Sequence, residues 1–369
     1  MNILFFIHCL IGGGAERVTV KLAEELINRG HNVTIGLTKE IIDYKLPERV
    51  KIEIYRKPLS YDGKNILMMK FYALCNHIIE YKKTRDIIRH CNPDIIIASW
   101  GSKTMPILRL HGNIPIIASE HNTFDREHTP QERKKRFILN SRFDKVVVLT
   151  NYDKEFTKNY LHNTIVIPNP LTFIPLTQDE YESSIPQRKN ILACGRINAY
   201  HVKGFDNLII AFSKVAKSYP GWDLDIAGAG NDESINKLKL LARDNNVESR
   251  VHFLGFCSDI NDVMKRHSIF ALTSRSEGFG MVITEAMAMG CTCVSYALTG
   301  PSEIIKDKED GLLVENQNVD EFSKALEVLM EDDALRKKLG TQALTNVRRF
   351  SVDRITNKWE ELFRVLKNE

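Results

Sequence analysis

Short runs of β-branched and other apolar residues alternate along the whole chain with longer segments whose apolar residues recur at helical spacing. This alternation predicts parallel sheets built from β–α–β units. Six runs lie in each half, so we expect an α/β protein with two Rossmann-like domains. The expected strands are residues 3–7, 33–37, 95–98, 114–119, 146–149 and 165–167, then 191–194, 224–227, 251–254, 269–272, 292–295 and 312–314.

A stretch with four prolines, residues 168–186, separates the two sets of strands and predicts a linker. We therefore expect an N-terminal domain over residues 1–170 and a C-terminal domain over residues 171–351. The closing segment, 352–369, has apolar residues at helical spacing and predicts a helix that packs on a core. Composition alone leaves open which domain receives this helix.

The composition is that of a globular protein, with 43% hydrophobic and 27% charged residues among 369. It excludes a disordered or fibrous chain. No segment reaches the ~18 apolar residues of a membrane span. Residues 1–8 have no basic leader, so they predict a first strand instead of a signal peptide. Seven cysteines without a framework spacing predict free thiols in a reducing cytoplasm.

Charge is distributed unevenly between the two halves. Residues 1–170 carry 26 basic and 18 acidic side chains (+8), and residues 171–369 carry 25 and 29 (−4). The basic half suggests an anionic partner, such as a membrane surface, a diphosphate-linked lipid or nucleic acid. Segment 130–139 contains four adjacent basic residues with apolar ones, and it is either a contact with anionic lipid or a solvated helix face.

Three glycines at residues 12–14 follow the first expected strand and open a helix. Such a turn lets backbone N–H groups approach an anion. The dinucleotide fingerprint would need a glycine where Arg17 stands and an acidic residue near Leu37. An NAD-dependent dehydrogenase is thereby disfavoured.

Two cations follow the first strand of the second half. Arg196 comes after Gly195, and Lys203 precedes Gly204. Cations at the carboxyl end of a strand can clamp a diphosphate, although solvated surface charges are the alternative. Gly228 follows the next strand and could let a nucleotide approach the backbone.

Segment 276–285 aims two carboxylates at one ligand. Glu277 precedes a predicted helix and Glu285 lies in its first turns, while the N–H groups of residues 280–282 point toward sugar hydroxyls or phosphate. Glutamate is also common early in helices for reasons of the helix dipole. The glycines at 278 and 280 are harder to explain in that way.

Together, the Gly-Gly-Gly-Ala-Glu-Arg motif, the two cations and the Glu-x7-Glu segment resemble the large group-1 family of retaining glycosyltransferases with the GT-B fold. The resemblance spans essentially the whole chain. It implies two Rossmann-like domains facing across a cleft, with the C-terminal helix crossing back to the N-terminal domain.

The resemblance also implies roles for single residues. The diphosphate would be held by Arg196 and Lys203, the donor sugar by Glu277 and the ribose by Glu285. Further donor contacts would come from Gly13, Gly14, Gly228, Phe253, Phe279, Gly280, Met281 and Val282. His121, in the sequence Ser-Glu-His-Asn at the end of a strand, resembles the family's histidine at the sugar pocket; a lone histidine is otherwise more often structural.

In this family, retention of configuration is thought to need neither a covalent enzyme intermediate nor a metal. Asp223-Leu-Asp225 imitates a metal-binding Asp-x-Asp, but strand alternation explains it. We expect transfer of a hexose or N-acetylhexosamine from a UDP-sugar to a saccharide or polyprenyl-diphosphate-linked saccharide, in surface polysaccharide or lipopolysaccharide synthesis, with no cofactor and no nucleic acid. The enzyme would be cytoplasmic, with peripheral contact to the membrane. A nucleotide-sugar epimerase and a catalytically silent binding protein are the alternatives.

Overall fold

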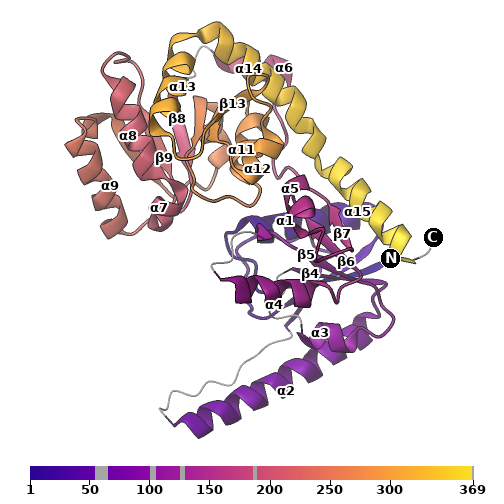
Figure 1. Ribbon diagram of the computed structural model, residues 1–369. Coiled ribbons are helices and arrows are strands. Elements are labelled where there is room, and N and C mark those ends of the chain that lie inside the picture. The colour runs from indigo at the N-terminus through magenta and orange to yellow at the C-terminus, as the bar shows by residue number, and fades with distance from the viewer. Residues whose placement is uncertain (55–64, 100–104, 125–128, 186–188, 368–369) are drawn as a thin grey trace. The chain divides into compact units, whose positions relative to one another are not determined.

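The computed structural model describes residues 1–54, 65–99, 105–124, 129–185 and 189–367 and divides the chain into two compact units (Figure 1). Unit 1 comprises Met1–Thr172 and Val352–Glu369, and unit 2 comprises Phe173–Ser351. Each unit holds one sheet whose described strand pairs are all parallel. The α/β class with two Rossmann-like domains is therefore confirmed.

The sheet of unit 1 has seven strands in the order β3-β2-β1-β4-β5-β6-β7, so the order reverses between β1 and β4. Its strands are β1 (Asn2–Ile7), β2 (Asn32–Leu37), β3 (Lys51–Ile54), β4 (Ile95–Ser99), β5 (Ile116–Ser119), β6 (Lys145–Val148) and β7 (Thr164–Val166). Its helices are α1 (Gly14–Asn28), α2 (Ile66–Cys91), α3 (Met105–Leu110), α4 (Pro130–Asn140), α5 (Asn151–Thr157) and α15 (Val352–Lys367).

Helix α15, the last helix of the chain, packs on the core of unit 1. Its buried residues Trp359 and Phe363 join a cluster that also contains Leu22 and Leu26 of α1. Glu360 fixes the register of the two helices, since its carboxylate pairs with Arg29 at 2.7 Å. The helical spacing of residues 352–366 thus encodes a buried face that lies against the first unit; residues 368 and 369 lie outside the described part.

The sheet of unit 2 has six strands in the order β10-β9-β8-β11-β12-β13, which reverses between β8 and β11. The strands are β8 (Lys189–Cys194), β9 (Leu224–Ala227), β10 (Val251–Gly255), β11 (His267–Leu272), β12 (Thr292–Tyr296) and β13 (Gly311–Val314). The helices are α6 (Gln178–Ser184), α7 (Tyr200–Lys203), α8 (Phe205–Ala216), α9 (Asp232–Asp244), α10 (Ile260–Lys265), α11 (Met281–Ala288), α12 (Thr299–Ile304), α13 (Val319–Glu331) and α14 (Asp333–Asn346).

Two features differ from the expectations. Strand β3 was not expected, because only every second residue of Lys51–Ile54 is apolar, as befits the edge of the sheet. The interpretation of residues 168–186 as a plain linker is wrong for its second part, which forms α6; Thr177 and Glu180 make a capping box there, and Tyr181 is buried. Pro186 lies outside the described residues.

Candidate active site at the carboxyl edge of the second sheet

The strand order of unit 2 reverses between β8 and β11, and ligands of open parallel sheets bind beyond the carboxyl ends of strands at such a point. Gly195 and Arg196 follow β8, and residues 273–277 follow β11. The loops that the sequence singled out in this half therefore converge at one edge of one sheet.

Two glycines are required where these loops touch. Gly204 has φ of +69°, and a Cβ there would lie 1.7 Å from the carbonyl oxygen of Thr273. Gly228 has φ of +153°, and its Cβ would lie 1.8 Å from the carbonyl oxygen of Gly195. Both contacts are with backbone, which cannot move aside cheaply, so these positions hold the loops after β8, β9 and β11 together.

Lys203 and Glu277 form the central ion pair of the edge. Lys203 Nζ donates to Glu277 Oε1 at 2.6 Å, and Ser274 Oγ donates to the same oxygen at 2.8 Å. The two ionic side chains retain 25% and 12% exposure, so they are screened from bulk water but open to a ligand. Glu277 Oε2 makes no hydrogen bond with the described residues and is available as an acceptor.

Arg196 is exposed at the carboxyl end of β8, and its guanidinium forms no hydrogen bond or ion pair with the described part of the chain. A second arginine, which the sequence analysis missed, is fully engaged. Arg275 forms a bidentate pair with Asp206 at 2.8 and 2.9 Å. Burial raises the pKa of the Asp206 carboxyl, but the Arg275 guanidinium outweighs burial, so this pKa lies below its ordinary value.

The Arg275–Asp206 pair fastens the loop after β11 to the first turn of α8. It thereby keeps Lys203 within reach of Glu277. No spacing rule joins residues 206 and 275, so pattern reasoning had no signal for this contact.

Helix α11 presents its N-terminus to the same edge. Gly280 is its N-cap with φ of +94°, and Met281 and Val282 supply first-turn N–H groups that have no carbonyl partner within the helix. The Phe279 ring is buried edge-to-face on Phe350, with ring centroids 5.5 Å apart. Phe279 therefore offers a ligand its backbone only.

Glu285 lies one turn into α11 and is buried, at 3% exposure. Burial raises the pKa of the neighbouring Cys194 thiol, and the Glu285 carboxylate raises this pKa further. Cys194 is consequently a neutral thiol at physiological pH. The predicted site residues 196, 203, 228, 277, 280–282 and 285 all belong to this edge of unit 2.

Phe253, which we expected among the donor contacts, has a partly buried ring that packs against the core of unit 2. The next apolar side chains outward are Leu254 and Phe256, and Phe256 is 79% exposed directly after β10. Phe256 is the aromatic side chain of this loop that a planar ligand can reach.

Asp223 and Asp225, which imitate an Asp-x-Asp motif, both pair with side chains of the protein. Asp225 lies 2.8 Å from Nε2 of the buried His267, and Asp223 pairs with Arg250 at 3.2 Å. Within the described residues, no group of three His, Cys, Asp or Glu side chains is placed to hold a metal ion.

In unit 1, the glycine loop opens α1, with Gly13 as N-cap and Gly14 as first residue. The Glu16 carboxylate folds back to this N-terminus, where a Cβ on Gly13 would meet Glu16 Oε2. The chain thus places its own anion where a phosphate would bind, which is the favourable place for negative charge on a helix. A phosphate at this position requires Glu16 to turn away.

His121 follows β5 at the carboxyl edge of the first sheet. Its Nε2 lies 3.2 Å from the Ser119 hydroxyl, and its Nδ1 is buried without a hydrogen-bond partner among the described residues. Burial lowers the pKa of His121 to about 4, although Glu120 and Asn169 act to raise it. The imidazole is therefore neutral at pH 7, with one nitrogen unused.

The basic segment of α4 is partly structural. The Arg136 guanidinium lies 3.9 Å from the centre of the Phe124 ring and pairs with the buried Glu120 at 2.8 Å. It also donates to the carbonyl oxygens of Asn122 and Thr123. Arg136 thus shapes the loop that carries His121. In the part of the chain that the structure covers, no helix has both the length and the apolar composition needed to cross a bilayer.

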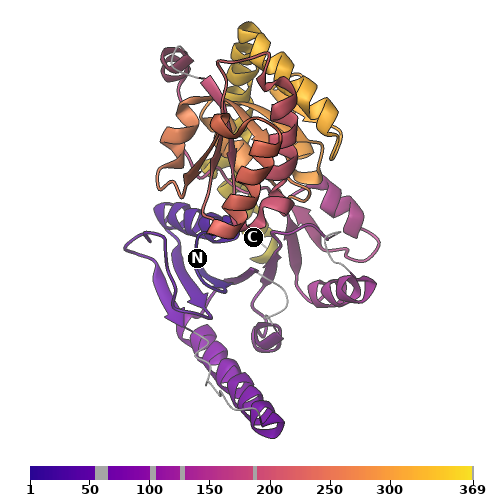
Figure 2. The ribbon, with the colours of Figure 1, turned by 90° about the vertical axis from the view of Figure 1, so that its left-hand side faces the viewer.

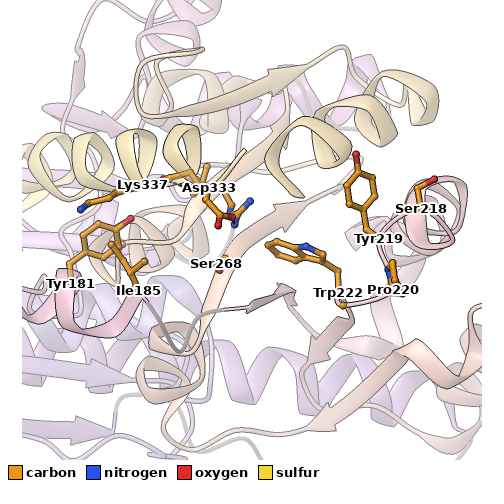
Figure 3. Close-up of a pocket in the computed structure, with 13 residues that line it drawn as sticks. Tyr181, Ile185, Ser218, Tyr219, Pro220, Trp222, Ser268, Asp333 and Lys337 are labelled. Atoms are coloured by element: carbon orange, nitrogen blue, oxygen red, sulfur yellow. Dashed lines mark hydrogen bonds and ion pairs between the residues drawn. The ribbon is translucent and has the colours of Figure 1, made fainter. Parts of the chain in front are cut away.

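A cavity of about 490 Å³ opens at the opposite edge of the second sheet (Figure 3). Trp222, Tyr219 and Tyr181 line it, and Thr292 at its wall begins β12. Arg336 stacks on Trp222 and donates to the carbonyl oxygen of Leu329. Because this cavity lies at the amino ends of the strands, we assign it no part in the candidate active site.

Comparison with known families divides the chain in the same way. Residues 178–345 match the family described as "Glycosyl transferases group 1", and residues 12–172 match "Glycosyltransferase Family 4". The two matches adjoin each other and together cover nearly all of the chain.

Individual proteins agree with these matches. An uncharacterized glycosyltransferase of Haemophilus influenzae is 28% identical over 365 residues, covering 96% of this chain and 98% of the relative. A Campylobacter jejuni enzyme is 28% identical over 382 residues, covering 100% and 99%; it is named GalNAc-α-(1→4)-GalNAc-α-(1→3)-diNAcBac-PP-undecaprenol α-1,4-N-acetyl-D-galactosaminyltransferase. The fold matches the crystal structure of Anabaena HepE in complex with UDP, with a TM-score of 0.80, 19% identity and coverage of 99% and 100%.

Proposed function

Because this chain belongs to the group 1 glycosyltransferases and has the GT-B fold, we propose that it transfers a hexosyl or N-acetylhexosaminyl group from a UDP-sugar to a lipid-linked saccharide, with retention of configuration. The Lys203–Glu277 pair at the switch point of the second sheet carries the proposal. In this pair, Lys203 is a cation that can bind a diphosphate, and Glu277 is a hydrogen-bond acceptor for sugar hydroxyls.

The pair can serve both ends of a nucleotide sugar at once. A lysine ammonium has three N–H donors, and Lys203 uses one on Glu277. The remaining donors, with the free guanidinium of Arg196, can hold diphosphate oxygens. Glu277 Oε2 can accept a hydroxyl of the donor sugar, since Lys203 and Ser274 both occupy Oε1. Glu285 and the N–H groups of Met281 and Val282 complete the proposed donor contacts.

The reaction follows from what these groups stabilise. The bond between the anomeric carbon and the diphosphate oxygen breaks, and the acceptor oxygen bonds to the same face of that carbon. The acceptor proton passes to the departing diphosphate, whose negative charge is held by Lys203 and Arg196. Preorganised donors aimed at developing charge are usually the largest single contribution to such a rate enhancement. This scheme uses no metal ion and no cofactor.

Unit 1 supplies the acceptor side of the proposal. Its positive charge suits a diphosphate-linked lipid, and the Campylobacter relative is named for a substrate of that kind. His121, neutral because burial lowers its pKa to about 4, would orient a sugar or an acceptor hydroxyl by hydrogen bonding. All seven cysteines are free thiols, which supports an enzyme that works on the cytoplasmic side of a membrane.

UDP release measured on the purified protein tests the proposal. A panel of UDP-hexoses and UDP-N-acetylhexosamines is offered with and without a polyprenyl-diphosphate-linked saccharide, and NMR of the product reports its anomeric configuration. Transfer should need the acceptor, survive EDTA and give the α-linkage of an α-linked donor. Interconversion of UDP-sugars without acceptor would instead identify an epimerase. UDP-sugar binding without either reaction would identify a silent binding protein.

A further inference from the structure

Helix α2 buries residues in its second half. Its buried residues are Glu80, Thr84, Ile87 and Ile88, all in the last three turns. Both ribbon views show the helix projecting from the rest of unit 1, with its N-terminal end outermost (Figures 1 and 2). None of the buried residues of this 26-residue helix lies in its first half.

The first half of α2 is rich in exposed apolar side chains. Leu67 is 77% exposed, and Phe71 and Leu74 are each 58% exposed. The exposed large apolar side chains of this half are Ile66, Leu67, Met68, Met69, Phe71, Leu74 and Ile78. A patch this continuous on a folded protein marks an interaction surface, because single exposed apolar residues elsewhere need no such explanation.

Charge changes along the same face of the helix. Leu67, Phe71, Leu74 and Ile78 follow one another by three or four residues and share a face. The next positions on that face are Lys82, Arg85 and Arg89. No acidic residue occurs between residues 66 and 79. Lys70 is the only lysine or arginine between residues 66 and 79. Along its axis the helix therefore presents a mainly apolar tip, residues 66–78, followed by a basic neck of Lys82, Arg85 and Arg89.

We propose that α2 anchors the protein on anionic membranes, with residues 66–78 among the acyl chains and Lys82, Arg85 and Arg89 at the lipid phosphates. Twelve residue steps of helix rise cover about 18 Å, comparable with the roughly 15 Å hydrocarbon depth of one leaflet. The order of tip and neck matches the order of acyl chains and phosphates in that leaflet. Arg85 also lies 3.4 Å from the exposed carboxylate of Asp86, a contact that water screens.

A second copy of the chain fits this surface less well than a lipid phase. Residues 66–69 are four consecutive exposed apolar positions, so they surround the helix instead of forming one stripe. A partner helix covers one side only. A parallel partner would also set the basic necks of the two copies against each other, whereas anionic phosphates neutralise them.

Helix α4, the membrane candidate from the sequence, has a weaker surface. Its Phe137 is buried and Arg136 is committed to Glu120. Ile138 is its exposed large apolar side chain, at 49%. The structure therefore favours α2 over α4 as the part that enters a bilayer.

Flotation of the full-length protein with vesicles tests the proposal. Vesicles of phosphatidylcholine alone are compared with vesicles of equal parts phosphatidylcholine and phosphatidylglycerol. The variant Leu67→Gln/Phe71→Gln/Leu74→Gln keeps good helix formers and should bind both vesicle types roughly a hundredfold more weakly. The variant Lys82→Gln/Arg85→Gln/Arg89→Gln should bind anionic vesicles at least about tenfold more weakly at low salt, and its binding to neutral vesicles should change little.

Matched controls remove exposed apolar side chains elsewhere. Ile138→Gln on α4 and Leu240→Gln on α9 should leave flotation unchanged, and UDP binding by every variant reports separately on the donor site. Hydrogen exchange of the wild type gives a readout that needs no variant: vesicles should protect the amides of residues 66–78 and not those of 130–140.

Three results would overturn the proposal. The first is full vesicle binding by the α2 apolar variant, and the second is loss of binding by Ile138→Gln instead. The third is a stable dimer in sedimentation analysis that the α2 variant converts to monomer while wild-type protein does not float. That third result would assign the surface to a second copy.

Discussion

Lys203 Nζ lies 2.6 Å from Glu277 Oε1, although 74 residues separate the two in the chain. The contact exists because β8 and β11 are neighbours at the reversal of strand order, so the loops that follow them meet. The Lys203 ammonium and the Glu277 carboxylate are therefore positioned by each other.

Removing either partner of this pair should lower kcat about as much as removing both. Lys203→Met and Glu277→Gln should each lower kcat roughly 100- to 1,000-fold, the usual loss when one preorganised charge stabiliser is removed. Each single change also leaves the other partner without its counter-charge, so the double variant should be no worse than about tenfold below either. Steady-state kinetics of the three variants check this prediction. Lys217→Met, an exposed lysine of the same unit, serves as control, and strictly additive losses would show that the residues act independently.

Gly204→Ala should destabilise unit 2 severely, by about 3 kcal/mol or more, because its Cβ would overlap the Thr273 carbonyl oxygen in addition to the cost of positive φ. Two glycines separate these causes. Gly30 has φ of +89° and Gly221 has no positive φ, and neither has an atom within 4 Å of an added Cβ. We therefore expect a loss of about 1 kcal/mol for Gly30→Ala and almost none for Gly221→Ala. Urea denaturation gives the three values, and equal losses at residues 204 and 30 would contradict the steric argument.

His121 should make the protein less stable at mildly acidic pH. Burial lowers its folded-state pKa to about 4, while an unfolded histidine titrates near pH 6.5. Between these values the unfolded chain binds the extra proton, so the stability present above pH 6.5 is lost as pH falls. Between pH 7 and pH 5 the loss is about 2 kcal/mol. Denaturation of wild type and His121→Asn at both pH values isolates this contribution, and an equal pH dependence in both proteins would show that His121 already titrates normally.

Trp359→Ala should lower the stability of unit 1 by about 3–5 kcal/mol, the usual range for emptying a buried aromatic site. The residue is 4% exposed and packs in the same cluster as Leu22 and Leu26. Val365, on the same helix, is 60% exposed, so Val365→Ala should change stability by less than about 0.5 kcal/mol. Calorimetry of the two variants compares them directly, and similar melting temperatures would mean that α15 adds little to the core.

Strands with long apolar runs could be predicted because burial on both faces leaves a continuous signal, as in the run 95–98 at β4. Strand β3 escaped because an edge strand buries less and alternates with charged residues. The segment after Pro175 was predicted as linker because prolines and acidic residues are typical of loops. The sequence signal for α6 is the capping box that begins at Thr177.

In the candidate site, strand periodicity already indicates how Phe253 packs. Val251 and Phe253 share a face of β10, and Val251 is buried, so the Phe253 side chain faces the core as well. Other contacts left no trace in the sequence. The pairs Arg275–Asp206 and Arg136–Glu120 join segments that only the fold brings together. The exposure of the apolar side chains of α2 could not be predicted either, because the sequence of an apolar helix does not show which elements pack against it.

The position of α15 has a consequence for the order of events during synthesis. The last core element of unit 1 is encoded after the whole of unit 2, so about 180 residues must be translated before Trp359 can cover the sheet that begins at Asn2. At about 5–20 residues per second, that delay is on the order of 10–40 s. During this interval the nascent first unit exposes the apolar face that α15 will cover, and unit 2 can complete its own core first. A chain that terminates near Ser351 would never bury that face, so we expect such products to depend on chaperones from the ribosome onward.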